Sequence, residues 1–351
     1  MGVAIKASLH ATFGRHETFT PRYSWLKRGF DAVASPEYRA GERIDGGYVF
    51  NDEDVHHRLG VGKNQARSIR FWLQAFRLVE ETKVDGSRSM TGNPTVFGDG
   101  LLNSVTGLDP WLEDAGTWWL LHWMALSPGG YLPVWWAAFH TFQPVEFTVE
   151  QLVEHVQAQV DATSAWHRPK SPNEATVRKD VLALLRAYAG TSGSRRRDPA
   201  DDNLDAPLVP LTLVRETEDA GRFRFGVGPK PGLSPSVVAF ACLDFLSRTG
   251  HTSRQALVAT LASEQGGPGR AFKLTERVLH ELLSEAAELH PAALALTSTA
   301  GTDALVVLSD LPLGQVAAEV LWKGYQQPGA ACPEPQTPYL PGSQFQPGEW
   351  T

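Results

Sequence analysis

The feature that most constrains the fold is a helical repeat of apolar and basic side chains between residues 50 and 98. One face of the predicted helix is apolar and consists of Ala66, Ile69, Leu73 and Phe76. A neighbouring stripe is basic or polar and consists of Lys63, Arg67, Arg70, Gln74 and Arg77, with Asn64 beside its start. Because both sets recur at intervals of three and four residues, the spacing predicts an amphipathic helix with one buried face and one basic face.

The flanking residues predict a winged helix-turn-helix. A short preceding helix would be capped by Asn51 or Asp52, and the glycines within residues 60–62 would supply the turn. Residues 78–84 and 95–97 would form a hairpin, with a Gly-Asn-Pro loop between them. A helix that is packed on one face and basic on another suits a DNA groove or backbone, so DNA is the expected partner.

The composition is that of a globular protein with local basic patches. The 351 residues predict two or three domains, and the apolar and charged fractions of 42% and 20% exclude wholesale disorder. The net charge of −7 argues against indiscriminate coating of nucleic acid, yet residues 1–28 and 55–90 each carry a net charge of +4. Such patches on an acidic background predict a specific docking face.

Cysteine content and hydropathy indicate the compartment. Two cysteines, Cys242 and Cys332, exclude a disulfide framework and a cysteine-based zinc site. The first residues lack the apolar run of a signal peptide, and the most apolar region, residues 111–142, is interrupted by Pro and Gly residues within 128–133. We therefore expect a cytoplasmic protein without a membrane span.

The helix–helix–hairpin pattern recurs along the chain. We expect a mainly α-helical fold with small β-hairpins (α+β), built from several winged-helix-like units around a Trp-rich helical segment. The second unit would begin with a capping box formed by Thr148 and Gln151. The third would contain helices near residues 236–247, 253–264 and 274–289. The predicted divisions are residues 1–145, 146–232, 233–324 and a flexible Pro/Gly-rich tail, 325–351.

Six of the eleven tryptophans lie between residues 111 and 142. They could be stacking platforms for nucleic-acid bases, or the core of paired helices that join the units. We favour the core, because large apolar faces are most readily buried between paired helices.

A dense set of reactive side chains lies between residues 13 and 30. The candidate phosphate-binding residues are Arg15, Arg22 and Lys27, and the candidates for proton transfer or metal binding are His16, Glu17 and Tyr23. Phosphodiester hydrolysis needs cations that stabilise the negative charge of the transition state, a carboxylate that binds a metal ion or acts as general base, and a general acid that protonates the leaving oxygen. The alternative is a surface segment in which Arg15 and Glu17 pair and aromatic residues anchor it to the core.

Several of these segments also carry a family resemblance. The segments that carry it are residues 13–30, 58–64, 67–70, 108–114 and 117–123, with weaker matches at 178–181 and 207–209. They resemble the SspB-like family of bacterial DNA phosphorothioation systems over residues 10–310. The resemblance implies an enzyme that nicks one DNA strand so that a cysteine desulfurase, an ATP pyrophosphatase and an ATPase can replace a phosphate oxygen by sulfur. The modified DNA would then be recognised as self by an antiphage restriction partner.

No catalytic motif of this family can be transferred onto these positions, so the roles of the residues rest on their chemistry. We expect Glu17 to be a ligand of Mg²⁺ or Mn²⁺ or a general base, and His16 to be a general acid or base. Tyr23 is a lesser candidate, as proton donor or nucleophile. Arg15, Arg22 and Lys27 would hold phosphate oxygens.

Two other functions remain open. The chain lacks recognisable nuclease metal motifs, which agrees equally well with a non-catalytic DNA-targeting adaptor that recruits the modification machinery. A transcriptional regulator would need dimerisation, and no coiled-coil stripe indicates it. ATP binding is not expected, because His57 replaces the first glycine of a phosphate loop and Asn64 replaces its Ser or Thr.

Overall fold

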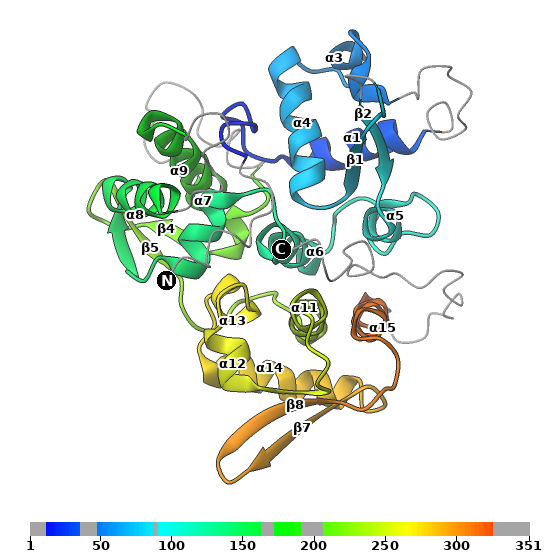
Figure 1. Cartoon of the computed structure of the whole chain (residues 1–351), viewed down its shortest axis with the longest axis vertical. Coiled ribbons are helices and arrows are strands. Elements are labelled where there is room, and N and C mark those ends of the chain that lie inside the picture. Colours follow the sequence, from blue (N-terminus) through cyan, green and yellow to red (C-terminus); the bar gives the residue numbers. More distant parts are fainter. Residues whose placement is uncertain (1–11, 36–47, 87–89, 163–171, 191–205, 326–351) are drawn as a thin grey trace.

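The computed structural model describes residues 12–35, 48–86, 90–162, 172–190 and 206–325. This part of the chain is mainly helical and carries three small antiparallel sheets, so the expected α+β class is confirmed. None of its helices is long and apolar enough to cross a membrane. Three groups of elements surround a central helix, α6 (Ala115–Leu126) (Figure 1).

The first group lies at one end of the long axis (Figure 1). Its elements are α1 (Tyr23–Ala34), the 3-10 turn η1 (Val49–Asn51), α3 (Val55–Arg58), α4 (Lys63–Ala75), β1 (Val79–Lys83), β2 (Met90–Pro94) and α5 (Val96–Leu102). Strands β1 and β2 form a two-stranded antiparallel hairpin. The predicted apolar face of α4 is confirmed, because Ala66, Ile69, Leu73 and Phe76 are all buried.

The short helix before the turn begins later than the sequence predicts. Helix α3 starts at Val55 behind Asp54, whereas Asn51 ends the η1 turn, so neither Asn51 nor Asp52 caps the helix. The turn itself agrees with the prediction. Gly60 has a φ of +62°, in the left-handed region that glycine enters without strain.

The second strand of the hairpin also differs from the prediction. It is formed by Met90–Pro94, so the Gly-Asn-Pro sequence lies in the strand and not in the loop. A Cβ atom on Gly92 would lie 2.1 Å from the Tyr48 ring, so the missing side chain lets the strand pass this ring. The Thr95 hydroxyl then accepts the N–H of Gly98 at 2.8 Å and caps the start of α5. Residues 96–97, which the sequence predicts as strand, are therefore helical.

The second group follows α7 (Pro133–Trp136) and the π-helical turn η2 (Ala137–Thr141). Its elements are β3 (Glu146–Thr148), α8 (Val149–Asp161), α9 (Glu174–Ala189), η4 (Val209–Leu211), β4 (Val214–Glu216) and β5 (Arg222–Phe225), with sheet order β3-β5-β4. The capping box is confirmed, because Thr148 and Gln151 exchange hydrogen bonds of 2.9 and 3.3 Å. Strand β3 was not predicted, because three residues are too few to show an alternating pattern.

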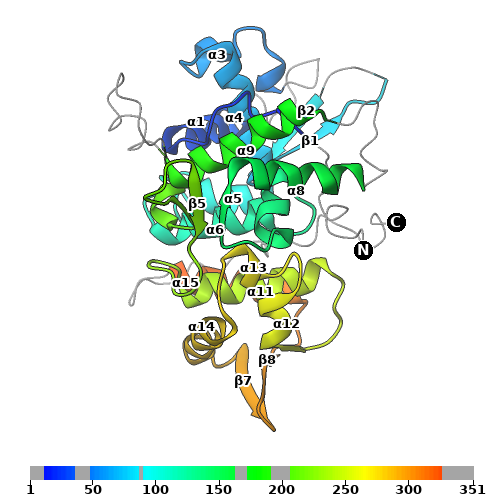
Figure 2. The same ribbon diagram turned by 90° about the vertical axis from the view of Figure 1, so that its left-hand side faces the viewer.

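The third group carries a long hairpin at the end opposite to α3 (Figures 1 and 2). Its elements are α11 (Pro235–Arg248), β6 (Gln255–Leu257), α12 (Val258–Ser263), α13 (Pro268–Ala271), α14 (Glu276–Leu289), β7 (Leu294–Thr299), β8 (Thr302–Val307) and α15 (Leu313–Tyr325), with sheet order β6-β8-β7. The helix predicted near residues 253–264 is split, because Gln255–Leu257 pairs with β8 before α12 begins. The predicted tail after residue 325 lies outside the described residues.

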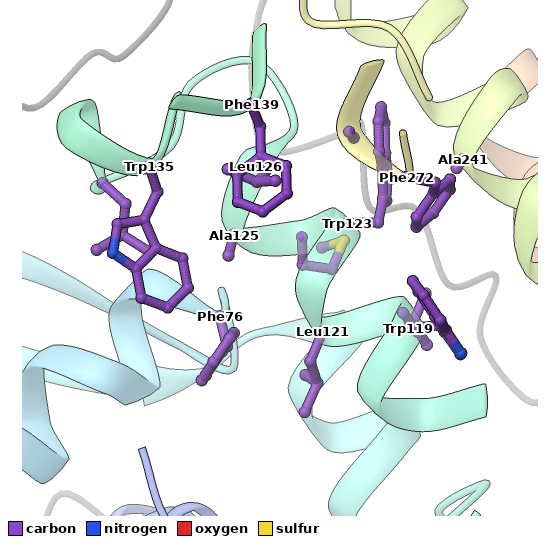
Figure 3. Packing of buried hydrophobic residues seen from close by; sticks show 14 of the residues in the cluster. Phe76, Trp119, Leu121, Trp123, Ala125, Leu126, Trp135, Phe139, Ala241 and Phe272 are labelled. Carbon is purple, nitrogen blue, oxygen red and sulfur yellow. The ribbon is translucent and has the colours of Figure 1, made fainter. Parts of the chain in front are cut away.

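The tryptophan-rich segment forms the shared core (Figure 3). Five of its tryptophans are at most 3% exposed, namely Trp118, Trp119, Trp123, Trp135 and Trp136. Ring contacts extend from them into all three groups, since the ring centroid of Trp135 lies 5.4 Å from that of Trp72 and 5.1 Å from that of Tyr188, and Trp119 lies 6.0 Å from Phe272. The core interpretation is therefore confirmed for these five residues, and only Trp111, at 63% exposure, lies at the surface.

Candidate nucleic-acid interface

Helix α1 supports the turn that precedes α4. A Cβ atom on Gly29 would lie 2.5 Å from the side chain of Ile69, so glycine allows the two helices to approach closely. One residue earlier, Arg28 is exposed and donates a hydrogen bond of 2.8 Å from Nη1 to the Leu59 carbonyl. The orientation of the turn is therefore fixed by α1.

The predicted basic stripe of α4 is exposed at the start of the helix and becomes progressively more buried along it. Lys63, Asn64 and Arg67 are exposed, and Arg67 Nη1 donates to Asn64 Oδ1 at 3.3 Å. The side chain of Gln65 accepts the N–H of Gly62 at 2.9 Å, which caps this end of the helix. The exposed end thus presents two cations and an amide on a fixed backbone.

Further along the same stripe, Arg70 and Gln74 hold the hairpin to the helix. Arg70 donates two hydrogen bonds, of 2.7 and 2.6 Å, to the carboxylate of Glu81 in β1, and Gln74 donates a third at 2.9 Å. The hydrogen bonds and charge of the Glu81 carboxylate raise the pKa of Arg70, so this arginine stays ionised. Burial, followed by the charge of Glu81, raises the pKa of Tyr48, whose hydroxyl donates to the same carboxylate.

The last cation of the stripe points into the protein. Arg77 is 8% exposed and donates to three carbonyl oxygens at the end of α6, those of Met124, Ser127 and Pro128, at 2.6 to 3.0 Å. Burial lowers its pKa well below the usual value. Arg77 therefore joins the end of α4 to the end of α6, and it does not belong to the exposed surface.

The N-terminal segment is held between α4 and α9 through His16. His16 Nε2 donates to Asp180 Oδ1 of α9 at 2.9 Å, and its Nδ1 accepts the N–H of Thr18 at 3.1 Å. The same carboxylate accepts the N–H of Gly14 at 3.0 Å, and Trp72 of α4 donates to the Phe19 carbonyl at 3.2 Å. Both ring nitrogens of His16 are thus engaged in hydrogen bonds. Proton transfer by His16 stays a prediction, and it would require one of these hydrogen bonds to break.

Lys27 also has its donors occupied. Its Nζ, on a side chain that is 9% exposed, donates to Asp31 at 2.7 Å, to the Leu102 carbonyl at 3.0 Å and to Ser104 at 2.7 Å. The same ammonium lies 4.9 Å from the ring centroid of Trp111. These contacts tie α1 to α5, so phosphate binding by Lys27 would require them to be exchanged.

The remaining candidates of the segment differ in exposure. Arg15 is exposed, and Glu17 is half-buried with a φ of +49° in the tight turn around His16. Arg22 is half-buried, with its guanidinium carbon 5.4 Å from the ring centroid of Trp25. The half-buried ring of Tyr23 lies edge-on to Trp118. Arg15 and Glu17 therefore flank the buried His16 in the turn. Phosphate binding by Arg15 and metal binding or general-base action by Glu17 stay predictions.

A preformed metal cage is not present in the described parts of the chain. No group of three or more His, Cys, Asp or Glu side chains there could hold a metal ion. The Asp180 carboxylate is already used by the N-terminal segment, which leaves Glu17 as the candidate ligand in this turn. Mg²⁺ is commonly held by one or two carboxylates together with water and substrate phosphates, and such a site needs no dedicated cage.

Comparison with known proteins decides the family. A family model described as a protein of unknown function, DUF4007, matches residues 13–325. The chain belongs to the DUF4007 family. None of the curated proteins compared with it matches.

Two solved structures extend this DUF4007 assignment. A magnesium-ion-bound crystal structure of SspB is 32% identical to the chain, covers 91% of it and 90% of SspB, and has a TM-score of 0.77. A second SspB crystal structure, also 32% identical, covers 93% and 92% with a TM-score of 0.80. The resemblance to the SspB-like family is thereby confirmed, and it spans the N-terminal segment and all three groups.

Two acidic residues that hold these side chains in place, Asp180 and Glu81, are not among the site residues predicted from the sequence. Asp180 lies in a segment that matches the family only weakly, residues 178–181, and Glu81 lies in a predicted hairpin strand, residues 78–84. A signal for Asp180 does exist, because it stands at a buried position of α9 beside Val177 and Val181. A charge at a helix position that must be buried predicts a specific partner.

Proposed function

We propose that this protein binds DNA and nicks one strand in a bacterial phosphorothioation system, in the cytoplasm. The observation that carries the proposal is its likeness to SspB at 32% identity over nine-tenths of both chains. The exposed cations at the start of α4 and in the N-terminal turn support a DNA substrate. Its partners would be a cysteine desulfurase, an ATP pyrophosphatase and an ATPase that use the nick.

For DNA binding we propose that α3, α4 and the β1–β2 hairpin act as a winged helix-turn-helix. Lys63, Asn64 and Arg67 would enter the major groove, because recognition helices read bases with their first turns. Trp72, which holds the N-terminal segment, lies nine residues beyond Lys63, or roughly 14 Å along the helix at 1.5 Å per residue. Arg15, in that segment, would therefore contact a phosphate at the edge of the same groove.

For nicking we propose the N-terminal turn as the reactive site. Glu17 would bind Mg²⁺ or Mn²⁺, with DNA phosphate and water completing the shell, or would act as general base. A bound metal ion would supply a Lewis acid for the phosphate oxygen. Arg15 and Arg22 would contact the phosphate, Tyr23 is a candidate proton donor, and His16 would fix the turn through Asp180.

A DNA-targeting adaptor is the second candidate. It is favoured by the internal contacts of His16 and Lys27, since both side chains lie in the segment proposed to react. In that case the protein would use the same α4 surface, and the cutting would be done by a partner.

A plasmid assay separates the two functions. Supercoiled plasmid is incubated with the protein in Mg²⁺, Mn²⁺ or EDTA, alongside Glu17→Gln and the exposed control Glu53→Gln. For a nickase we expect open-circle product with either metal, none with EDTA, and a loss of about 10²-fold or more in rate for Glu17→Gln with unchanged DNA affinity. Intact plasmid in every condition, with DNA still bound, would contradict nicking and support the adaptor.

A further inference from the structure

The loop that joins α5 to α6 presents two apolar side chains to solvent. Trp111 is 63% exposed and Val105 is 91% exposed, whereas the other five tryptophans between residues 111 and 142 are at most 3% exposed. Tryptophan is largely buried on average, because its ring carries a large apolar area. Residues 108–114 are also one of the segments that carry the family resemblance, and the function proposed so far does not use them.

The inner side of this loop is fixed by a buried carboxylate. Asp109 is 7% exposed and accepts the N–H groups of Glu113 and Asp114 at 2.9 and 3.0 Å. It also accepts the hydroxyl of Thr117, in the first turn of α6, at 2.6 Å. Hydrogen bonds to an ionised carboxylate are among the stronger ones in proteins. The loop is therefore attached firmly to the start of α6.

The backbone of the loop is strained next to the exposed tryptophan. Leu112 has a φ of +60°, in the left-handed region that a bulky side chain enters only at a cost. Its side chain is 3% exposed, and its carbonyl accepts the indole N–H of Trp118 at 3.4 Å. Leu112 thus anchors the loop to the core, while Trp111, one residue earlier, stays outside. Backbone strain that the surrounding structure maintains is concentrated at ligand sites and switches.

Lys27 of α1 connects the two exposed residues. Its ammonium lies 4.9 Å from the ring centroid of Trp111 and donates to the hydroxyl of Ser104 at 2.7 Å. The turn that carries Val105 is closed by Asn103, whose side-chain oxygen accepts the N–H of Val105 at 2.9 Å. Side chains that are held in place before binding lose little conformational entropy when a partner binds.

The charge of the loop is negative. Residues 103–116 contain three carboxylates and no lysine or arginine. Glu113 and Asp114 are exposed, and the cation beside the ring, Lys27, is paired with Asp31 at 2.7 Å. The loop would repel DNA phosphates, whereas a cation would be attracted both by the carboxylates and by the aromatic ring. The chemistry of the surface therefore fits a basic segment of a protein.

We propose that Trp111 and Val105 form the centre of a docking surface for a partner protein whose contacting segment carries arginine or lysine between apolar residues. The cation of the partner would lie against the exposed part of the Trp111 ring, beside Glu113, and its apolar neighbours would cover Val105. Tryptophan is among the residues that contribute most to protein interfaces. This surface would serve the protein whether or not it nicks DNA.

The surface is tested with a fluorescein-labelled hexapeptide of alternating leucine and arginine, titrated with the full chain at physiological salt and followed by fluorescence anisotropy. We expect saturable binding to the wild type. Affinity should fall about fivefold in Trp111→Ala and about threefold in Glu113→Gln, and Trp111→Phe, which keeps an aromatic ring, should be intermediate.

Matched controls remove similar side chains elsewhere. Leu289→Ala truncates a side chain that is 61% exposed on α14, and Glu53→Gln neutralises an exposed carboxylate before α3. Each should change the affinity for the peptide by less than about twofold, because neither lies in the loop.

Three results with the peptides would overturn the proposal. Wild-type affinity in both Trp111→Ala and Glu113→Gln would do so, and so would the absence of saturable binding to the wild-type chain. Equal binding of a hexapeptide of alternating leucine and glutamate would show that the charge of the loop does not select the partner.

Nucleic acid is the other occupant that an exposed tryptophan can take, by stacking on a base. Duplex DNA and an oligothymidine strand are therefore titrated with the same variants. A loss of affinity for either DNA in Trp111→Ala but not in Leu289→Ala would assign the ring to DNA and overturn the proposal. Unchanged DNA affinity together with weakened peptide binding would support it.

Discussion

Asp180 is a buried carboxylate whose partners all lie more than 160 positions away in the sequence. It accepts the N–H of Gly14 and a hydrogen bond from His16 Nε2, and so attaches the N-terminal turn to α9. A carboxylate can accept both bonds with little distortion because it has about four acceptor sites. The position of Glu17 therefore depends on a residue of the second group.

Replacement of this carboxylate should release the turn. In Asp180→Ala the N–H of Gly14 and the His16 ring lose their acceptor, and leaving such donors buried costs about 1–3 kcal/mol. We expect urea unfolding to show a loss of that size, together with slower nicking if Glu17 is catalytic. Lys179→Ala changes the exposed neighbour and should stay within about 0.5 kcal/mol of wild type. Equal stability of the two variants would mean that Asp180 does not anchor the turn.

At the level of the helices, the basic stripe of α4 has an exposed end and a hydrogen-bonded end. Arg67 near its start is exposed, whereas Arg70 one turn later is bound to Glu81. Arg67→Ala should lower the salt slope of duplex binding by about 0.9 and leave the free energy of unfolding within about 0.5 kcal/mol of wild type. Arg70→Ala should destabilise the chain by about 1–3 kcal/mol, because the carboxylate of Glu81 is left buried without its cation.

The two variants are compared by fluorescence anisotropy on duplex DNA and by urea unfolding. Equal losses of affinity and no loss of stability would mean that both arginines face DNA. That result would contradict the hydrogen-bonded arrangement of Arg70.

The same helix shows what periodicity can predict. Spacing identified the apolar face of α4 correctly, because burial of one face imposes a 3.6-residue repeat. It could not separate Arg67 from Arg70 or Arg77, since the acceptors that remove the last two from the surface lie in β1 and after α6. The position of β2 depends likewise on a long-range contact, the packing of Gly92 against the Tyr48 ring. Local rules therefore find elements, while partners from distant segments decide which side chains stay free.

The three groups contact one another at the centre of the fold, and His122 of α6 connects two of them by hydrogen bonds. Its Nδ1 accepts the hydroxyl of Tyr188 from the second group at 2.6 Å, and its Nε2 donates to the Ala271 carbonyl of the third group at 2.9 Å. A neutral imidazole has one donor and one acceptor nitrogen, so it suits both partners without a further proton. Burial accordingly lowers the pKa of His122 to about 3.

Acid should therefore lower the stability of the fold by protonating His122. The unfolded chain protonates this histidine below about pH 6.5 and the folded chain only near pH 3, so stability should fall as the pH is lowered from 6.5 towards 3. One proton contributes a slope of about 1.4 kcal/mol per pH unit within that window. His122→Asn should reduce the slope of unfolding free energy, measured in urea between pH 4.5 and 6.5, by this amount. The exposed control His57→Asn should keep the wild-type slope, and an unchanged slope in His122→Asn would mean that protonation elsewhere governs acid unfolding.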